Sequence, residues 1–134
     1  MELTIFTDGG SINNPGPAAI AYLIYLDGKP LSSFSTKIGI NSNNFAEYTA
    51  LVRALEWVKQ NNALSAAKIT VFSDSSLMVN QLNGLYKVKN STIRQFILKI
   101  RILEQELNAP IVYKYIPREK NRLADLLVKK ELQN

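Results

Sequence analysis

The chain has 134 residues, of which 46% are hydrophobic and 20% are charged, and this length and balance indicate one globular domain with a single packed core over residues 1–134. The absence of cysteine and histidine excludes disulfides, thiolate or ordinary zinc sites and an imidazole base. The net charge is +5, and residues 85–134 carry 11 Lys/Arg against 5 Asp/Glu, which favours a polyanion such as nucleic acid as partner, although a solvated basic face explains this charge equally well.

The first part of the chain predicts an antiparallel meander of three strands. Leu3–Thr7 has the composition of a strand, and we expect it to stop at Asp8-Gly9-Gly10. After a polar loop, Ala18–Leu26 and Leu31–Ile38 are the next two strands, and the Asp27-Gly28 pair between them is a strong hairpin signal.

The rest of the chain alternates helices with strands. Apolar residues at positions 48, 51, 52, 55 and 58 keep helical spacing, whereas the later β-branched runs are typical of strands. The expected elements are a helix to about Lys59, a strand over Ile69–Phe72, a helix that is capped by Ser73-Asp74-Ser75 and runs to Leu82, a helix from about Thr92 to Leu107, a strand over Ile111–Ile116 and a helix from near Asn121. The order βββαβααβα predicts an α/β domain with a mixed sheet flanked by helices.

Four carboxylates fall at the ends of these elements. Asp8 is expected to end the first strand and Asp74 the fourth, with Glu47 in the first turn of the first helix and Asp125 in the first turns of the last. Sites in open α/β sheets form beyond the carboxyl ends of strands, where helices begin. Four acids placed there can hold two divalent cations roughly 3.5–4 Å apart, and an oxygen-only ligand set selects Mg²⁺ or Mn²⁺.

Each acid also has an ordinary structural explanation. Asp8 suits a turn before two glycines, and Glu47 suits the partner of a helix cap at Asn44. Asp74 suits an N-cap, and Asp125 is a favourable charge near a helix N-terminus. The metal site is therefore favoured by the set of four acids and not by any one of them.

Small and polar residues that can contact phosphate lie near these acids in the sequence. They offer hydrogen-bonding groups or let the backbone approach a ligand closely, although turn chemistry alone also explains them. These candidate nucleic-acid contacts are Gly9, Gly10, Ser11, Asn13, Asn14, Gly16, Ser42, Asn43 and Asn44.

Five blocks occur in this order: Thr7-Asp8-Gly9-Gly10, Asn14-Pro15-Gly16-Pro17-Ala18, Asn43-Asn44-x-Ala46-Glu47-Tyr48-x-Ala50-Leu51, Ser73-Asp74-Ser75 and Asn121-x-x-Ala124-Asp125. The ordered set, running from Leu3 to about Leu127, resembles the type 1 ribonuclease H family. The resemblance implies a mixed five-stranded sheet, with three antiparallel and then two parallel strands. It also implies an endonuclease that hydrolyses the RNA strand of RNA–DNA hybrids with two divalent cations, giving 5′-phosphate and 3′-hydroxyl ends.

The same resemblance implies roles for single residues. Asp8 bridges both metals, Asp125 completes the site of the nucleophilic water, and Glu47 with Asp74 holds the second metal. Glu47 also touches a ribose 2′-hydroxyl, the group that distinguishes RNA from DNA. Ser11, Asn14, Asn43 and Asn44 match positions where the family contacts the hybrid, and Ser42 matches a DNA phosphate contact.

The chain departs from many bacterial members in three places. It has no histidine in the loop before the last acid. Arg118 in this loop resembles the arginine that another branch of the family has there, and it is a further candidate catalytic residue. The alternative is a solvated loop arginine. Asp125 follows Asp74 by only 51 residues, which leaves no room for an extra basic helix, so Lys87 and Lys89 are expected as partial substitutes with a weaker, more salt-sensitive grip. Ser76 stands where relatives often carry a glutamine that contacts the minor groove.

Three other classes of protein share some of these features. A non-catalytic nucleic-acid-binding domain on the same fold is disfavoured, because four acids repel phosphate unless a metal intervenes. Integrase and transposase nucleases share an acidic site but lack the Asn-Pro-Gly loop and the Asn-Asn-x-Ala-Glu block. A structural or interaction protein would use the acids only as caps and turn residues.

The sequence contains no run of about 18 apolar residues and begins without the basic and apolar parts of a signal peptide. We therefore expect a cytoplasmic protein with no membrane partner. No feature marks an oligomer interface or a protein partner, so the expected state is a monomer that binds RNA–DNA hybrid.

Overall fold

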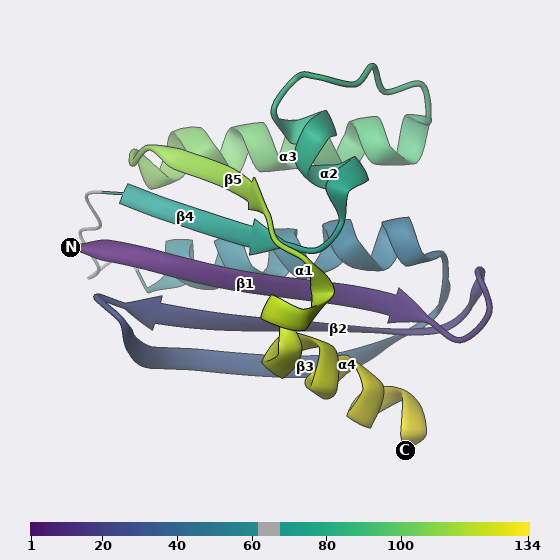
Figure 1. The fold of residues 1–134 in the computed structure, drawn as a ribbon. Coiled ribbons are helices and arrows are strands. Elements are labelled where there is room, and N and C mark those ends of the chain that lie inside the picture. The colour runs from purple at the N-terminus through teal and green to yellow at the C-terminus, as the bar shows by residue number, and fades with distance from the viewer. Residues whose placement is uncertain (62–67) are drawn as a thin grey trace.

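A computed structural model describes residues 1–61 and 68–134, which form a five-stranded sheet with helices on its faces (Figure 1). The strands are β1 (Glu2–Ser11), β2 (Gly16–Leu26), β3 (Lys29–Asn41), β4 (Lys68–Ser73) and β5 (Ile111–Tyr115). The helices are α1 (Asn43–Gln60), α2 (Ser76–Leu82), α3 (Ser91–Leu107) and α4 (Arg122–Gln133), with a short 3₁₀ helix η1 (Arg118–Lys120) before α4. Among these helices none has the length and apolar character needed to span a membrane.

The strand order is β3-β2-β1-β4-β5. β1 pairs with β2 and β2 with β3 in antiparallel fashion, whereas β4 is parallel to both β1 and β5. The predicted fold class and the order βββαβααβα are confirmed. The predicted hairpin is also confirmed, since Asp27 and Gly28 both have positive φ angles, of 49° and 82°, between β2 and β3.

The prediction that the first strand stops at Asp8 is wrong. β1 continues to Ser11 because its antiparallel partner β2 keeps pairing with it as far as Ala18. The parallel partner β4 ends earlier, and its last pair with β1 joins Ser73 to Thr7. Asp8 therefore lies inside a strand, one residue past the point where the parallel pairing ends.

The two faces of the sheet are covered unequally. α1, α2 and α3 pack on one face, and the larger core lies between them and the alternate strand residues such as Leu3, Ile5 and Val71. On the other face α4 packs through Val128 on the small side chains of β2. Figure 1 looks onto this second face, where α4 lies in front of the sheet and leaves much of β4 and β5 uncovered.

The residues that cap α1 and α2 are not the ones that the ordinary structural explanations of Glu47 and Asp74 require. Ser42 caps α1, its hydroxyl accepting from the Phe45 N–H at 3.1 Å, so Asn44 is not the cap and Glu47 lies in the second turn, not the first. Ser75 caps α2 in the same way, so Asp74 is not the cap. The carboxylates of Glu47 and Asp74 are therefore not used to cap these helices.

β1 and α1 approach each other closely at Gly9. A Cβ atom built on Gly9 would lie 2.4 Å from the carbonyl carbon of Ala46 and 2.7 Å from the nitrogen of Glu47. Backbone on both sides leaves no flexible group to move aside. Glycine at this position thus permits the contact that brings Asp8 beside Glu47.

We predict that Gly9→Ala lowers the free energy of unfolding by about 1–3 kcal/mol, the usual cost of overpacking. Urea denaturation measures the effect. Gly10→Ala is the matched control, because a Cβ there would meet its nearest neighbour, the Asn43 side chain, only at 3.8 Å. Equal stability of the two variants would contradict the close packing at Gly9.

Candidate metal centre

Three carboxylates from three different elements meet at one end of the sheet. Asp8 comes from β1, Glu47 from α1 and Asp74 from the residue after β4, and one oxygen of each lies within 4.8 Å of the others. Asp8 and Glu47 are buried, with 6% and 8% exposure. The structure thus brings together three of the four acids that the sequence singles out.

The fourth acid, Asp125, stands at the edge of this cluster. It lies in the first turn of α4, as expected, and lines a pocket of about 320 Å³ together with Asp8 and Glu47. One of its carboxylate oxygens is 2.9 Å from the ammonium group of Lys129. Lys129 therefore holds Asp125 in an ion pair, which sequence reasoning missed although the spacing of four residues in a helix was an available signal.

The acids raise one another's pKa. Burial raises the pKa of Asp8 to about 8, and the charges of Asp74 and Asp125 add to this effect, whereas the Gly9 N–H and the Arg118 guanidinium oppose it. Burial, with the charges of Asp8 and Asp74, also raises the pKa of Glu47. The pKa of Asp74 is raised by burial against the opposing charge of Arg118. A bound cation would replace the protons that this cluster otherwise retains.

Two carboxylate oxygens in the cluster lack a partner among the described residues. Glu47 Oε1 and Asp74 Oδ2 are buried and accept no hydrogen bond. Leaving buried anionic oxygens unpaired is costly, and a cation would satisfy them. The donor set consists of oxygens alone, which fits a hard divalent cation such as Mg²⁺ or Mn²⁺.

Several of the predicted nucleic-acid contacts form a network beside the acids. Asn43 Oδ1 accepts from the Ser11 N–H at 2.8 Å and from the Ser11 hydroxyl at 3.0 Å. Asn14 Oδ1 accepts from the Asn43 N–H at 2.9 Å. Ser11 and Asn43 also line the pocket, together with Gly9 and Gly10. These bonds fix the end of β1 and the following loop against the start of α1.

Other candidate residues have different positions. Asn13 is exposed in the loop after β1 with a φ of 59°. The hydroxyl oxygen of Ser42 already accepts a hydrogen bond as the helix cap, which leaves its O–H free to donate. Asn44 is half-buried in the first turn of α1, and Ser76 is the exposed first residue of α2.

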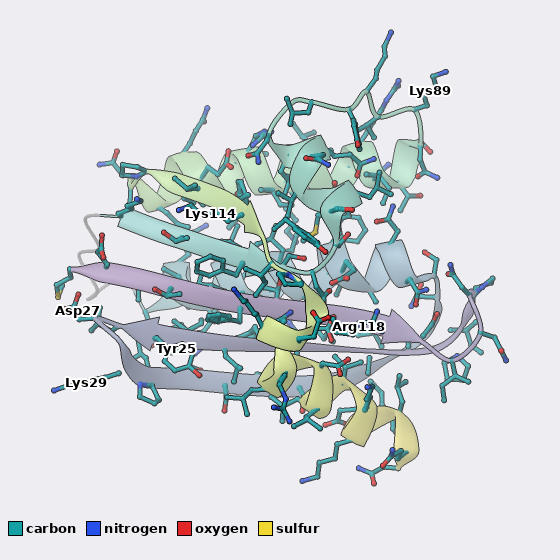
Figure 2. The ribbon with its side chains drawn as sticks, viewed as in Figure 1. Tyr25, Asp27, Lys29, Lys89, Lys114 and Arg118 are labelled. Carbon is teal, nitrogen blue, oxygen red and sulfur yellow. The ribbon has the colours of Figure 1, made fainter. Side chains whose placement is uncertain are left out.

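The basic candidates separate into two groups. Arg118, in η1, lines the pocket with the acids, and its charge opposes the rise in the pKa of Asp8. Lys87 and Lys89 are exposed in the segment between α2 and α3. In Figure 2 Lys89 lies on the loop above α3, well away from Arg118 near the start of α4. The structure thus brings Arg118 to the acids but not the two lysines.

A buried amide joins the start of α4 to the strand that carries Asp8. Asn121 is only 2% exposed, and its Nδ2 donates to the backbone oxygen of Thr7 at 2.9 Å. It makes no side-chain cap bond in α4. The sequence shows Asn121 within a block that ends at Asp125, but gives no sign that its side chain anchors η1 and α4 to β1.

Comparison with known proteins agrees with this fold and acidic pocket. A family model described as reverse transcriptase-like matches residues 6–131. The structure of LC11-RNase H1 in complex with an RNA/DNA hybrid superposes with a TM-score of 0.92 at 41% identity, covering 98% of this chain and 96% of that one. RNase H1 from Halobacterium salinarum superposes with a TM-score of 0.90 at 30% identity, covering 99% and 98%. The fold and site therefore define a protein of the ribonuclease H-like class.

The chain belongs to the type 1 ribonuclease H family. A bifunctional protein of Mycobacterium tuberculosis is 33% identical over 129 residues, which make up 95% of this chain but 34% of that protein. The chain thus spans about a third of the length of this curated relative.

We predict that the metal-free protein loses stability as the pH rises from about 4 to about 8. In this window the folded chain keeps the proton of Asp8, whose pKa is about 8, whereas the unfolded chain has lost it. Asp8→Asn removes this titrating group and therefore this loss of stability. The free energy of unfolding of the variant, minus that of the parent, should be larger at pH 8 than at pH 4. Chemical denaturation in EDTA measures both, and parallel pH profiles would contradict the buried, proton-holding state of Asp8.

Proposed function

We propose that this chain is a metal-dependent endonuclease that hydrolyses the RNA strand of RNA–DNA hybrids to 5′-phosphate and 3′-hydroxyl ends. The observation that carries the proposal is the cluster of Asp8, Glu47 and Asp74, whose oxygens lie within 4.8 Å of one another, beside a pocket that Asp8 and Glu47 line together with Ser11 and Asn43. The likeness to LC11-RNase H1, solved with an RNA/DNA hybrid, supports this substrate. Two divalent cations would supply an activated water and stabilise the charge of the scissile phosphate.

The positions of the acids support different roles for them. Asp8 shares the cluster of carboxylates with Glu47 and Asp74, and it lines the same pocket as Asp125. This shared position supports a bridging role for Asp8 between two cations. Glu47 and Asp74 would hold one of these cations. Asp125 would contribute to the other after leaving Lys129.

The surroundings of the pocket can place a hybrid over these acids. Gly9 and the network of Ser11, Asn14 and Asn43 offer small and amide groups next to the cluster, and Ser42 offers a free hydroxyl donor at the start of α1. Glu47 would accept from a ribose 2′-hydroxyl, which would select the RNA strand. Arg118, which also lines the pocket, would contact the phosphate.

We predict that Asp74→Asn still folds and binds a labelled RNA–DNA hybrid but loses cleavage by at least about 100-fold, because the amide removes an anionic metal ligand at similar size. Gel analysis of the RNA strand with Mg²⁺ or Mn²⁺ measures cleavage. Asp27→Asn is the matched control, since Asp27 lies in the distant β2–β3 turn (Figure 2) and an asparagine tolerates its positive φ. Retained cleavage in Asp74→Asn would move the catalytic centre elsewhere.

We further propose that Lys87 and Lys89 contact the hybrid backbone. The double variant Lys87→Gln/Lys89→Gln should weaken hybrid binding and lower the slope of log affinity against log salt by about two, since each lost phosphate contact lowers it by about 0.9. Titrations of hybrid at several salt concentrations measure the slope. Lys29→Gln, next to the remote β2–β3 turn, is the control and should leave the slope unchanged. An unchanged slope in the double variant as well would show that the segment between α2 and α3 does not reach the substrate.

A further inference from the structure

The face of the sheet toward the viewer in Figure 1 carries half-buried aromatic side chains that η1 and α4 cover only in part. β1 alternates, so that Leu3 and Ile5 enter the core below the sheet while Phe6 and Asp8 belong to the opposite face. α4 packs on the alanines of β2 and does not extend over β4 and β5. An apolar sheet face left open in this way is typical of a binding surface.

Four strands contribute one continuous row on this face, which we call the aromatic row. The strand register aligns Leu23 of β2, Phe6 of β1, Phe72 of β4 and Lys114 of β5 as successive neighbours. The rings of Phe6 and Phe72 are nearly parallel, at 20° with centroids 5.2 Å apart. Tyr25 adds a third ring, edge-on to Phe6 at 5.8 Å. Three aromatic rings from three strands thus form one surface.

A pocket of about 210 Å³ adjoins the aromatic row. Phe6, Leu23 and Tyr25 line one side of it, and the chain from Glu119 to Ala124 lines the other. This volume is several times the roughly 30 Å³ that one water molecule occupies. The rings therefore border a space that is large enough for a ligand group and that the neighbouring side chains do not fill.

Exposed cations surround the same surface. Lys114 stands at the end of the aromatic row, and Lys120 and Arg122 lie in the wall of the pocket, where Glu119 is the one acid. Within residues 1–61 and 68–134 none of these three cations belongs to an ion pair. The surface therefore offers flat rings for stacking and positive charge for an anionic backbone.

The aromatic row also lies beside the acids of the candidate metal centre. Asp8 follows Phe6 by two residues on the same face of β1, and Asp74 follows Phe72 by two. Residues so spaced in a strand are about 7 Å apart. A nucleic-acid strand that lies along the row, across the β-strands, therefore runs beside the acids.

We propose that this open face binds single-stranded nucleic acid, with bases stacked on Phe6, Tyr25 and Phe72 and phosphates beside Lys114, Lys120 and Arg122. Aromatic side chains on an exposed sheet with a basic border bind unpaired strands in this manner. An apolar peptide would cover the rings but leave the cations without counter-charges, and a second copy of this chain carries the same net charge of +5. The occupant is the unpaired strand that continues beyond a hybrid, so this inference goes beyond the proposed cleavage.

The test is fluorescence anisotropy with a short labelled oligodeoxythymidylate in EDTA. DNA is not cleaved under the proposed function, and binding needs no metal, so the two proposals can fail separately. Tyr25→Leu, which keeps an apolar side chain but removes the stacking ring, should weaken binding about fivefold or more. Lys114→Gln, at an exposed position that cannot disturb the core, should weaken binding and reduce its salt dependence.

Two controls locate the bound strand. Lys99→Gln removes a charge from α3, which covers the opposite face of the sheet, and should leave oligonucleotide binding unchanged. Unchanged binding in both Tyr25→Leu and Lys114→Gln would overturn the proposal, as would binding that is lost only in Lys87→Gln/Lys89→Gln. A parent protein that dimerises, and that Tyr25→Leu converts to a monomer without loss of oligonucleotide affinity, would assign the face to a second copy of the chain instead.

Discussion

The contact between the backbone of Gly9 and the start of α1 is the constraint on which the acidic centre depends. β1 is the central strand and α1 the helix packed most closely on it, so their separation fixes how near Asp8 can come to Glu47. At this point the separation is set by main-chain atoms on both sides. Because the backbone is stiff, the pair of acids is held by the fold itself and not by the flexible choice of side-chain rotamers.

The carboxylates near this contact form an energetically unfavourable cluster. Burial and mutual repulsion raise the pKa of the clustered acids, and buried oxygens of Glu47 and Asp74 have no donor within the described residues. Such groups detract from stability unless a ligand satisfies them, and they are typical of functional sites. The acids of the centre are thus better explained by a cation than by the capping roles that their positions in the sequence also allow.

The sequence predicted what depends on neighbouring residues and missed what depends on distant ones. The hairpin at Asp27 and Gly28 and the helix spacing after Tyr48 are local signals, and both were correct. The end of β1 was wrong because pairing with β2, and not the glycines after Asp8, determines where it stops. The bond from Asn121 to Thr7 requires the placement of α4 on the sheet, which hydrophobic patterns do not specify. The ion pair of Lys129 with Asp125 is the exception, because its four-residue spacing within α4 is a local signal that the sequence offered.

The acidic centre has two parts that differ in the free energy needed to open them locally, because one part is joined to β1 through Asn121 at the start of α4. Asp8, Glu47 and Asp74 are carried by β1, by α1 and by the residue after β4, and these elements border the larger core. Asp125 and Arg118 belong to α4 and η1, and α4 packs on the sheet through the small cluster around Val128. Elements with few buried apolar contacts open locally at a lower free energy than a central strand. A brief opening of α4 and η1 would therefore withdraw one acid and one cation but leave three carboxylates together, so the centre can loosen without separating these three acids.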